Sequence, residues 1–471
     1  MKKFPLLSKA MALGAVTLGL LIALESVSTI VHEREGRLHE AEAAVADSLA
    51  TRQTLLGPAL QRRCEERWET VQGSGAEQRR VVEQRSFTLR QAPQSLQISG
   101  DARLEPRYRG LFKVNGFAAS TQLTAQWADL KALAPAAEHA GGALQCEAPE
   151  LFVAVSDVRG IRVASIKLGD STLTVQPGSR YAGEGAGFHA VLPEAALAAT
   201  GLQAEVALEL LGTGSLAIAP IGEATQVALR SDWPHPSFGG RFLPSSREIG
   251  SAGFSAQWAM SALATSAGAR LVEGAPPCRL DQAPSPGTPD QGACVETFGV
   301  HFIDPVNPYV MSDRATKYGL LFIALTFVGV GLVEVLRSLR VHPIQYLLVG
   351  SALAVFFLLL VSLTEHLGFN IAYACASAAC TGLLGFYGSF VLRGARAGAL
   401  FGAAIALVYG ALFLLLRLEQ SALVLGSVAL FVVLAAVMAA TRKIDWYALM
   451  QQMRGEPPAG GSEWQATKAP A

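Results

Sequence analysis

The stretch Tyr318–Leu336, YGLLFIALTFVGVGLVEVL, decides the fold because it carries a single charge over the length of a membrane-spanning helix. A bilayer core is about 30 Å thick and a helix rises about 1.5 Å per residue, so about 20 apolar residues are needed to cross it. Four similar segments follow: Ile344–Leu363, Phe369–Leu392, Ala397–Leu416 and Ala422–Ala440. The sequence therefore predicts a C-terminal bundle of five transmembrane helices over residues 318–440.

A sixth apolar segment lies near the N-terminus. Lys2, Lys3 and Lys9 precede the run Ala10–Leu24, which continues more weakly to Val31. A cleaved signal peptide has the same layout, but the sequence from Glu25 onward lacks a clean small-x-small cleavage site. We therefore expect a retained membrane anchor over residues 1–31.

Basic residues gather in alternate loops of the predicted bundle. Short loops rich in Lys and Arg stay in the cytoplasm, and such residues follow the first, third and fifth C-terminal spans: Arg337, Arg340, Arg393, Arg396, Arg442 and Lys443. With six spans, this pattern predicts that both termini are cytoplasmic and that residues 32–317 are periplasmic. We expect a multi-pass protein of the inner (plasma) membrane, with the lipid bilayer as its first partner.

The charges of the chain are balanced, with 38 basic and 38 acidic residues among 471. Nucleic-acid-binding proteins need many cationic contacts to phosphates, and the sequence has no long basic run, so we expect no nucleic-acid partner. Residues 441–471 form the predicted cytoplasmic tail. Its Pro-, Gly- and Ser-rich part, Arg454–Ala471, is predicted to be disordered.

The predicted periplasmic region begins with a helix and continues as strands. Residues 32–56 contain many helix formers and few breakers, which favours a helix that leaves the membrane. Alternating or β-branched segments follow, punctuated by Gly, Pro and Asp: SFTLR, LQISGDARL, LFVAVSDV, RVASIKL, STLTVQPG and GSLAIAPIG. The predicted fold class is an α+β membrane protein with an anchor helix, a large sandwich-like β domain and a helical bundle.

Two parts of this region resemble each other. Tyr108–Phe112 precedes the sequence Ala-Gln-Trp-Ala at 125–128, and Phe238–Phe242 precedes the same four residues at 256–259. This echo favours a duplicated β module with equivalent aromatic and Trp positions in its two cores. Chance recurrence of a short motif is the alternative.

Four cysteines lie in the predicted exported region: Cys64, Cys146, Cys278 and Cys294. Disulfides persist in that compartment, and four thiols allow three pairings. The nearest pair, Cys278 with Cys294, would close a Pro- and Gly-rich loop and leave Cys64 with Cys146. No Cys-x-x-Cys spacing occurs, so we expect structural disulfides rather than a redox or zinc site.

Motifs that indicate catalysis are missing from the sequence. It contains no His-Glu-x-x-His, Walker or Gly-x-Ser-x-Gly pattern, and no lysine has the serine three residues earlier that serine β-lactamases use. We expect a protein that is not an enzyme and uses no cofactor or metal. An unrecognised enzyme for peptidoglycan or lipid, with His189, His235 or His301 at its site, is one alternative.

Two acids of the membrane part raise a second alternative, a transporter or channel built on the bundle. Glu334 lies near the inner end of its span, and Glu365 lies with His366 at an outer turn. An intramembrane acid can mark a proton or substrate path. Both acids are close enough to an interface to reach water, so we favour a structural role.

Exposed turns of the periplasmic domain are the candidate recognition surfaces. In Ser231–Phe238, SDWPHPSF, two prolines impose an extended turn that a Trp can attach to a sheet. Asp157–Ile161 is the second such segment, and packing is the alternative role for both. The candidate residues for recognition or structure are Trp233, His235, Phe238, Asp157, Arg159, Tyr108 and Arg109.

Several specific stretches resemble one known family, the CreD family of inner-membrane proteins. They are Gln53–Pro58, Tyr108–Gly110, Asp157–Ile161, SDWPHPSF, the run SDRATKY that ends at Tyr318, His342–Gly350, Thr364–His366 and Ile444–Tyr447. The resemblance extends over nearly the whole chain and implies the same topology. It also implies a role in cell-envelope integrity and colicin E2 tolerance. Members belong to the regulon of the CreBC two-component system, which in some bacteria is connected with the response to β-lactams.

The resemblance supplies no catalytic residue. The leading hypothesis is therefore a non-catalytic envelope protein whose periplasmic domain binds a periplasmic or inner-membrane protein or another envelope component.

Overall fold

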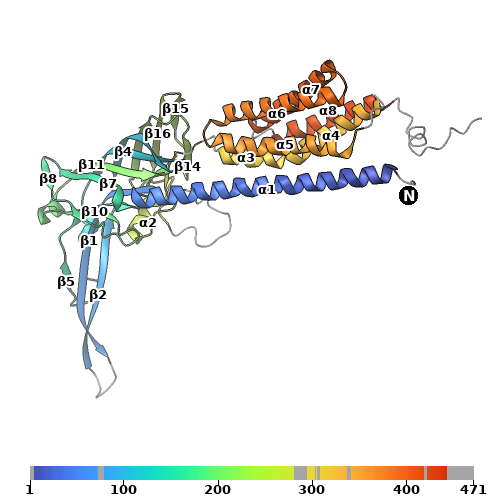
Figure 1. The fold of residues 1–471 in the computed structure, drawn as a ribbon. Helices are drawn as coiled ribbons and strands as arrows, with labels where there is room; N and C mark the ends of the chain where they lie inside the picture. The colour runs from blue at the N-terminus through green and yellow to red at the C-terminus, as the bar shows by residue number, and fades with distance from the viewer. Residues whose placement is uncertain are drawn as a thin grey trace, which may run out of the picture. The chain divides into compact units, whose positions relative to one another are not determined.

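The computed structural model describes residues 5–72, 79–280, 294–302, 304, 308–336, 341–417 and 422–442. The chain divides into two compact units. The helical unit comprises Met1–Arg37 and Val306–Ala471, and the β unit comprises Leu38–Pro305. Each is described by itself below (Figure 1). The tail segment Arg454–Ala471, predicted to be disordered, lies outside the described residues.

Long apolar helices make up the helical unit. The long ones are the first part of α1 (Pro5–Ser48), α4 (Gly319–Leu336), α5 (Pro343–Thr364), α6 (Phe369–Val391), α7 (Ala395–Arg417) and α8 (Ala422–Thr441), and a shorter, more polar helix, α3 (Pro308–Lys317), precedes α4. Among the described residues, α1, α5, α6 and α7 are each long and apolar enough to cross a membrane. Helices α3 and α4 meet at a 41° bend and together make a fifth candidate, whereas α8 has a shorter apolar stretch.

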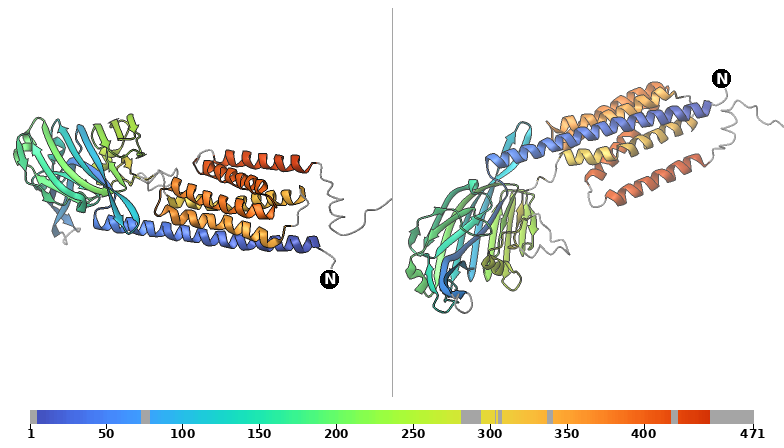
Figure 2. Two further views of the ribbon diagram at one scale, coloured as in Figure 1. Left: turned by 45° about the horizontal axis from the view of Figure 1, so that its top comes forward. Right: turned by 90° about the horizontal axis from the view of Figure 1, so that it is seen from below.

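Small residues bring α6 and α7 close together. A Cβ atom added to Gly385 would lie 3.5 Å from the Cα atom of Gly402, and one added to Gly398 would lie 2.5 Å from Ser389. Larger residues at these positions would separate the helices, so the Gly- and Ala-rich faces form a packing seam. The two helices run side by side in both views of Figure 2.

Helix α1 ends earlier than predicted. The sequence favoured a helix over 32–56, but α1 ends at Ser48 and a strand begins at Gln53. Leu55, Leu56 and Leu60 are fully buried because this strand lies between two others in the middle of a sheet. Leu, Gln and Ala have high intrinsic helix propensity, and burial on both strand faces overrides it here.

Two sheets make up most of the β unit. The first contains β1 (Gln53–Gln72), β2 (Arg79–Gln91), β5 (Ala143–Cys146), β6 (Glu150–Val155), β9 (Gln176–Pro177), β10 (Gly187–Val191), β12 (Ser215–Ile218), β14 (Ser237–Gly240) and β17 (Phe298–His301). Within the described residues its order is β14-β17-β12-β1-β6-β10-β9, and β2 and β5 also pair with β1. A short helix, α2 (Ala267–Glu273), also belongs to this unit.

The second sheet is largely antiparallel. Its strands are β3 (Ser95–Arg109), β4 (Phe112–Trp127), β7 (Ile161–Leu168), β8 (Ser171–Leu173), β11 (Leu202–Thr213), β13 (Ala224–Ser231), β15 (Ser246–Gly250) and β16 (Gly253–Ser261). In the described part of the chain they follow the order β15-β16-β13-β3-β4-β11-β7-β8, in which only β13 and β3 run parallel. All six sequence segments predicted to be strands contribute to β-structure.

One apolar core joins the two sheets. Burial alternates along β13, which points Val227 and Leu229 inward and leaves Ala228 and Arg230 exposed. From the first sheet, Phe152 and Phe298 enter the same cluster, and the rings of Trp258 and Phe298 lie 5.2 Å apart. The β unit therefore has the two packed layers of a sandwich, as predicted.

The predicted duplication is wrong for the first half of its motif. Tyr108 ends β3 in the second sheet and is 69% exposed, whereas Phe238 lies in β14 of the first sheet and packs on Trp258. Both echo tryptophans are buried, Trp127 in β4 and Trp258 in β16. Because both belong to one core cluster, the echo does not mark two equivalent modules.

Candidate functional site: a polar clamp and an exposed arm

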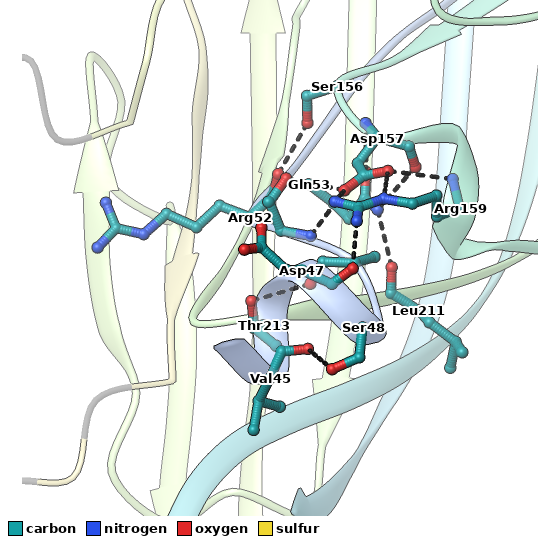
Figure 3. A network of polar contacts seen from close by, with 12 residues as sticks. Val45, Asp47, Ser48, Arg52, Gln53, Ser156, Asp157, Arg159, Leu211 and Thr213 are labelled. Atoms are coloured by element: carbon teal, nitrogen blue, oxygen red, sulfur yellow. Dashed lines mark hydrogen bonds and ion pairs between the residues drawn. The ribbon is translucent and has the colours of Figure 1, made fainter. Parts of the chain in front are cut away.

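A network of polar contacts surrounds Asp157 at the point where α1 passes into β1 (Figure 3). Asp157 is the N-cap of a short 3-10 helix, η3 (Val158–Gly160), and is 8% exposed. Its Oδ2 atom accepts hydrogen bonds from the Thr51 N–H at 2.9 Å and from the Arg159 guanidinium at 2.7 Å. The Arg159 backbone N–H and Nε donate to Oδ1 at 3.1 and 3.0 Å.

These donors hold the Asp157 carboxyl in its charged form. The Arg159 side chain lowers the pKa of Asp157 most, and the Thr51 and Arg159 backbone N–H groups lower it further against the opposing effect of burial. Hydrogen bonds to a carboxylate stabilise its ionised state. Asp157 therefore stays negative at any pH above its ordinary titration range.

Gln53, the first residue of β1, joins the same network. Its side-chain amide donates to the carbonyl oxygens of Asp157 at 3.0 Å and Leu211 at 2.8 Å, and its Oε1 atom accepts from the Asp157 N–H at 3.3 Å. A Cβ atom on Gly160 would lie 2.2 Å from the Leu211 carbonyl oxygen, so only glycine fits there. We call Gln53, Asp157, Arg159 and Gly160 the clamp.

The clamp fixes the end of α1 to the β unit. Arg159 donates to the Asp47 carbonyl oxygen in the last turn of α1, and Thr213 Oγ1 donates to the Ala50 carbonyl oxygen at 3.0 Å. Two distinctive sequence stretches, Gln53–Pro58 and Asp157–Ile161, therefore meet in space. Because their polar atoms are used internally, the structure favours packing over recognition for Asp157 and Arg159.

The SDWPHPSF segment is also packed against its own domain. Trp233 is 9% exposed, and its indole N–H donates to the His235 carbonyl oxygen at 2.8 Å. Phe238 contacts Phe254 and Trp258 edge to face. This arrangement agrees with the interpretation that Trp233 attaches the turn to a sheet, and His235 contributes its backbone and an edge contact to Trp233.

A two-stranded ribbon extends from the β unit (Figure 1). We call it the arm: Glu65–Gln72 of β1 and Arg79–Ser86 of β2, which pair in antiparallel register. Within the described residues, β5 pairs with β1 only as far as Arg67, so Trp68–Gln72 pair with β2 alone. An isolated two-stranded ribbon is marginally stable in water, so the arm needs additional contacts at its base.

A disulfide and a buried carboxylate support the base of the arm. Cys64 and Cys146 pair directly across β1 and β5 and form a disulfide. Glu66 is fully buried, and its Oε1 atom accepts hydrogen bonds from the backbone N–H groups of Glu138 and His139, both at 2.9 Å. These bonds lower the pKa of Glu66, and the bond from the His139 N–H has the largest effect. The ring of His139 stacks on Trp68 with centroids 3.7 Å apart.

The opposite face of the arm is open to solvent. Val71 and Val82 are 57% and 66% exposed. Residues two apart in a strand share a face, as do directly paired residues. Since Glu69 pairs with Val82 and Val71 pairs with Arg80, all four side chains lie on this face. An ion pair between Glu69 and Arg80 lies beside the valines, with 3.6 Å between Oε2 and the guanidinium. The arm has no distinctive sequence motif, since its alternating charges are typical of an ordinary exposed strand.

A second exposed hairpin contains Tyr108 and Arg109. They end β3, and a two-residue turn at Gly110 and Leu111 leads to β4. Gly110 has a φ of +61°, which suits glycine at a tight turn. Both candidate residues are exposed, so they are available to a partner.

The two membrane-associated acids are paired with basic residues of α1. Glu334 accepts from Lys9 and, at 2.8 Å, from the Tyr346 hydroxyl. Glu365 lies 3.3 Å from the Arg34 guanidinium. Lys9 and Arg34 are separated by about 37 Å along the helix at about 1.5 Å per residue, which exceeds the thickness of a bilayer core. Pairs at opposite ends of an apolar stretch favour a structural role over a continuous path.

The remaining cysteine pair and histidines complete the candidate residues. Cys278 and Cys294 form the second disulfide. His189 is buried, with its Nδ1 atom 2.6 Å from the Gly178 carbonyl oxygen, and His301 lies in β17. In the part of the chain that the structure describes, no group of three His, Cys, Asp or Glu side chains could hold a metal ion.

Two shallow depressions lie over the second sheet. One of about 650 Å³ is lined mostly by small and polar residues of β3, β4, β7, β11 and β13. Another of about 590 Å³ lies beside it over β3, β13, β15 and β16. The two share Asp101 and Arg230. His189, His235 and His301 line neither depression.

Comparison with known proteins identifies the family. The sequence model of the family described as Inner membrane protein CreD matches residues 5–447. The chain is 36% identical over 450 residues to the Inner membrane protein CreD of Escherichia coli (strain K12), and the alignment covers 95% of each protein. With its N-terminal apolar helix, large β unit and further apolar helices, the chain belongs to the CreD family of inner membrane proteins.

Proposed function

We propose that this protein contributes to cell-envelope integrity or to the envelope stress response by binding another envelope component, without catalysis, through the arm of an exported β unit. The main observation behind this proposal is that several contacts stabilise the base of the arm. A disulfide, the buried Glu66 and the Trp68–His139 stack stabilise a ribbon that adds little to the core. A rigid exposed element loses little conformational entropy when it binds.

Two features support an exported β unit with cytoplasmic termini. Both disulfides belong to the β unit, and disulfides persist in the periplasm but not in the cytoplasm. The alternation of basic loops in the sequence supports the same orientation. Labelling of Leu263→Cys, at a 99% exposed position of the β unit, with a membrane-impermeant maleimide in intact spheroplasts tests this placement.

The surroundings of the candidate histidines support binding rather than catalysis. A catalytic site needs an acid–base or nucleophilic set that converges on a space for substrate. His189 is bonded to a backbone carbonyl, and His235 packs on Trp233. The depressions over the second sheet are shallow and have no histidine in their lining.

Site-specific crosslinking in cells tests the arm. A photoreactive amino acid at Val71 or Val82 is expected to give one discrete adduct with an envelope component, whereas the same group at Leu263 is not. With the photoreactive group at Val71, Val82→Asp is expected to weaken this adduct. The variant Val71→Asp/Val82→Asp, without the photoreactive group, is expected to fail to complement envelope sensitivity to a β-lactam while it keeps wild-type protease resistance. Full complementation by this folded variant would contradict the proposal.

A further inference from the structure

The hairpin that joins β3 to β4 has the composition of a membrane-surface element. Its residues Arg103–Lys113, RLEPRYRGLFK, which we call the basic hairpin, contain four cations and one acid, a net charge of 4 − 1 = +3. Tyr108 and Leu111 at its end are 69% and 59% exposed. Aromatic and aliphatic side chains flanked by cations favour the interface between water and anionic lipid headgroups.

The base of this hairpin lies beside the end of α1 and the residues that follow β17, all within the β unit. A Cβ atom on Gly116 would lie 3.2 Å from Leu49, the residue after α1. The Asn115 amide donates to the carbonyl oxygen of Phe302, just after β17, at 3.3 Å, and Lys113 lies 3.9 Å from Asp304. The basic hairpin thus projects from the end of the β unit through which the chain enters and leaves.

The internal ion pairs of the hairpin are weak. Arg107 lies 2.7 Å from Glu105, and Arg103 lies 3.5 Å from Asp101, which lies outside the hairpin. All four side chains are at least 37% exposed, and exposed pairs of this kind contribute little to stability because water screens them. Lipid phosphates can therefore compete for these guanidinium groups without a large cost to the fold.

We propose that the basic hairpin docks on a phospholipid bilayer surface that contains anionic headgroups. Arg107, Arg109 and Lys113 contact phosphates, and Tyr108 and Leu111 enter the interfacial region. This inference does not rest on binding by the arm, which is a separate element of the β unit.

The test uses the full-length protein in nanodiscs of phosphatidylcholine, with or without phosphatidylglycerol. Cys375 and Cys380 are replaced by alanine, and a nitrobenzoxadiazole (NBD) probe is placed at Leu111→Cys or Tyr108→Cys. The matched control is Leu263→Cys. Leu263 lies at the opposite end of the second sheet from the basic hairpin. It follows Ser261, and Ser261 is aligned through Ala224 with Ser95, the first residue of β3.

Quenching by spin-labelled lipid is expected to be at least twofold greater at residues 108 and 111 than at residue 263, and to rise with the phosphatidylglycerol content. Arg107→Gln/Arg109→Gln is expected to reduce the quenching to near the control value while protease resistance and disulfide content stay unchanged. Equal quenching at all three positions, or quenching that does not depend on phosphatidylglycerol, would overturn the proposal. If protein rather than lipid covered the basic hairpin, quenching at residues 108 and 111 would be no greater than at residue 263.

Discussion

The clamp and the arm use the same kinds of residue in opposite ways. In the clamp, Asp157 is 8% exposed and receives its hydrogen bonds from within the β unit. On the open face of the arm, Glu69 and Arg80 pair at 65% and 82% exposure. The clamp has the more distinctive sequence, yet its polar atoms are occupied. The arm has an ordinary sequence, yet its surface is open to a partner.

This contrast shows that a distinctive motif can mark structure rather than recognition. Asp-Val-Arg-Gly is constrained because a buried carboxylate needs donors on every side and because Gly160 has no room for a side chain. An exposed binding face has no such requirements, since water satisfies its polar atoms until the partner arrives. Changes to the clamp and the arm test this difference, in order from the largest expected effect on stability to the smallest.

Removing the disulfide at the base of the arm is expected to lower the free energy of unfolding more than any other change. Loss of the Cys64–Cys146 bond, which spans 82 residues of sequence, should lower the free energy of unfolding by about 4.5 kcal/mol in a chain-entropy account. The matched control, Cys278→Ser/Cys294→Ser, removes a bond that closes a loop of 16 residues and should lower the free energy of unfolding by about 3 kcal/mol. Pulse proteolysis measures both. Faster hydrogen exchange in Trp68–Val71 is expected only for Cys64→Ser/Cys146→Ser, and its absence would show that the arm does not depend on the bond.

Asp157→Ala should lower the free energy of unfolding of the β unit by about 3 kcal/mol, because it leaves the donors of the clamp without an acceptor. The control Glu69→Ala removes an exposed pair and should cost less than about 0.5 kcal/mol. Equal costs would remove the distinction between the clamp and the arm.

The effect of Asp157 should also depend on pH in one direction. Its pKa is lowered in the folded protein, so its stabilising contribution is complete above the ordinary Asp pKa of about 3.9 and is lost as the pH falls below it. The stability difference between wild type and Asp157→Asn should therefore be constant from about pH 7 to 5 and decrease below about pH 4. A difference that grew on acidification would contradict the assigned ionisation.

Gly160→Ala should cost about 2 kcal/mol, since the new Cβ atom would overlap the Leu211 carbonyl oxygen. Gly185→Ala is the control, because no atom lies within 4 Å of its Cβ position. Thermal unfolding of the purified full-length protein separates the two variants. A tolerated Gly160→Ala would mean that the η3 turn can move away from β11.

Val71→Ser/Val82→Ser on the arm should leave stability within about 0.5 kcal/mol of wild type, because both side chains are already exposed. With the photoreactive amino acid at Val71, Val82→Ser alone should weaken crosslinking to the envelope component proposed above. A marked loss of stability would show that the open face of the arm is covered within the protein itself.

The sequence by itself determined which parts of the chain are apolar helices and where several of the strands lie. Hydrophobic length located the membrane helices to within a few residues, because crossing a bilayer depends on the local sum of side-chain transfer energies. Alternating or β-branched residues located segments of β2, β3, β6, β7, β8 and β12. The start of β1 was predicted as a helix, because its Leu residues are buried on both faces and do not alternate with polar residues.

Only the tertiary structure decided which polar residues turn inward and which hairpins stay open. Asp157 is buried by Thr51, Gln53 and the end of β11, all distant in sequence, and the end of α1 at Ser48 depends on the neighbours that bury β1 on both sides. Such burial is a property of packed surfaces rather than of any segment. The role of a polar motif therefore follows from the groups that the fold places around it.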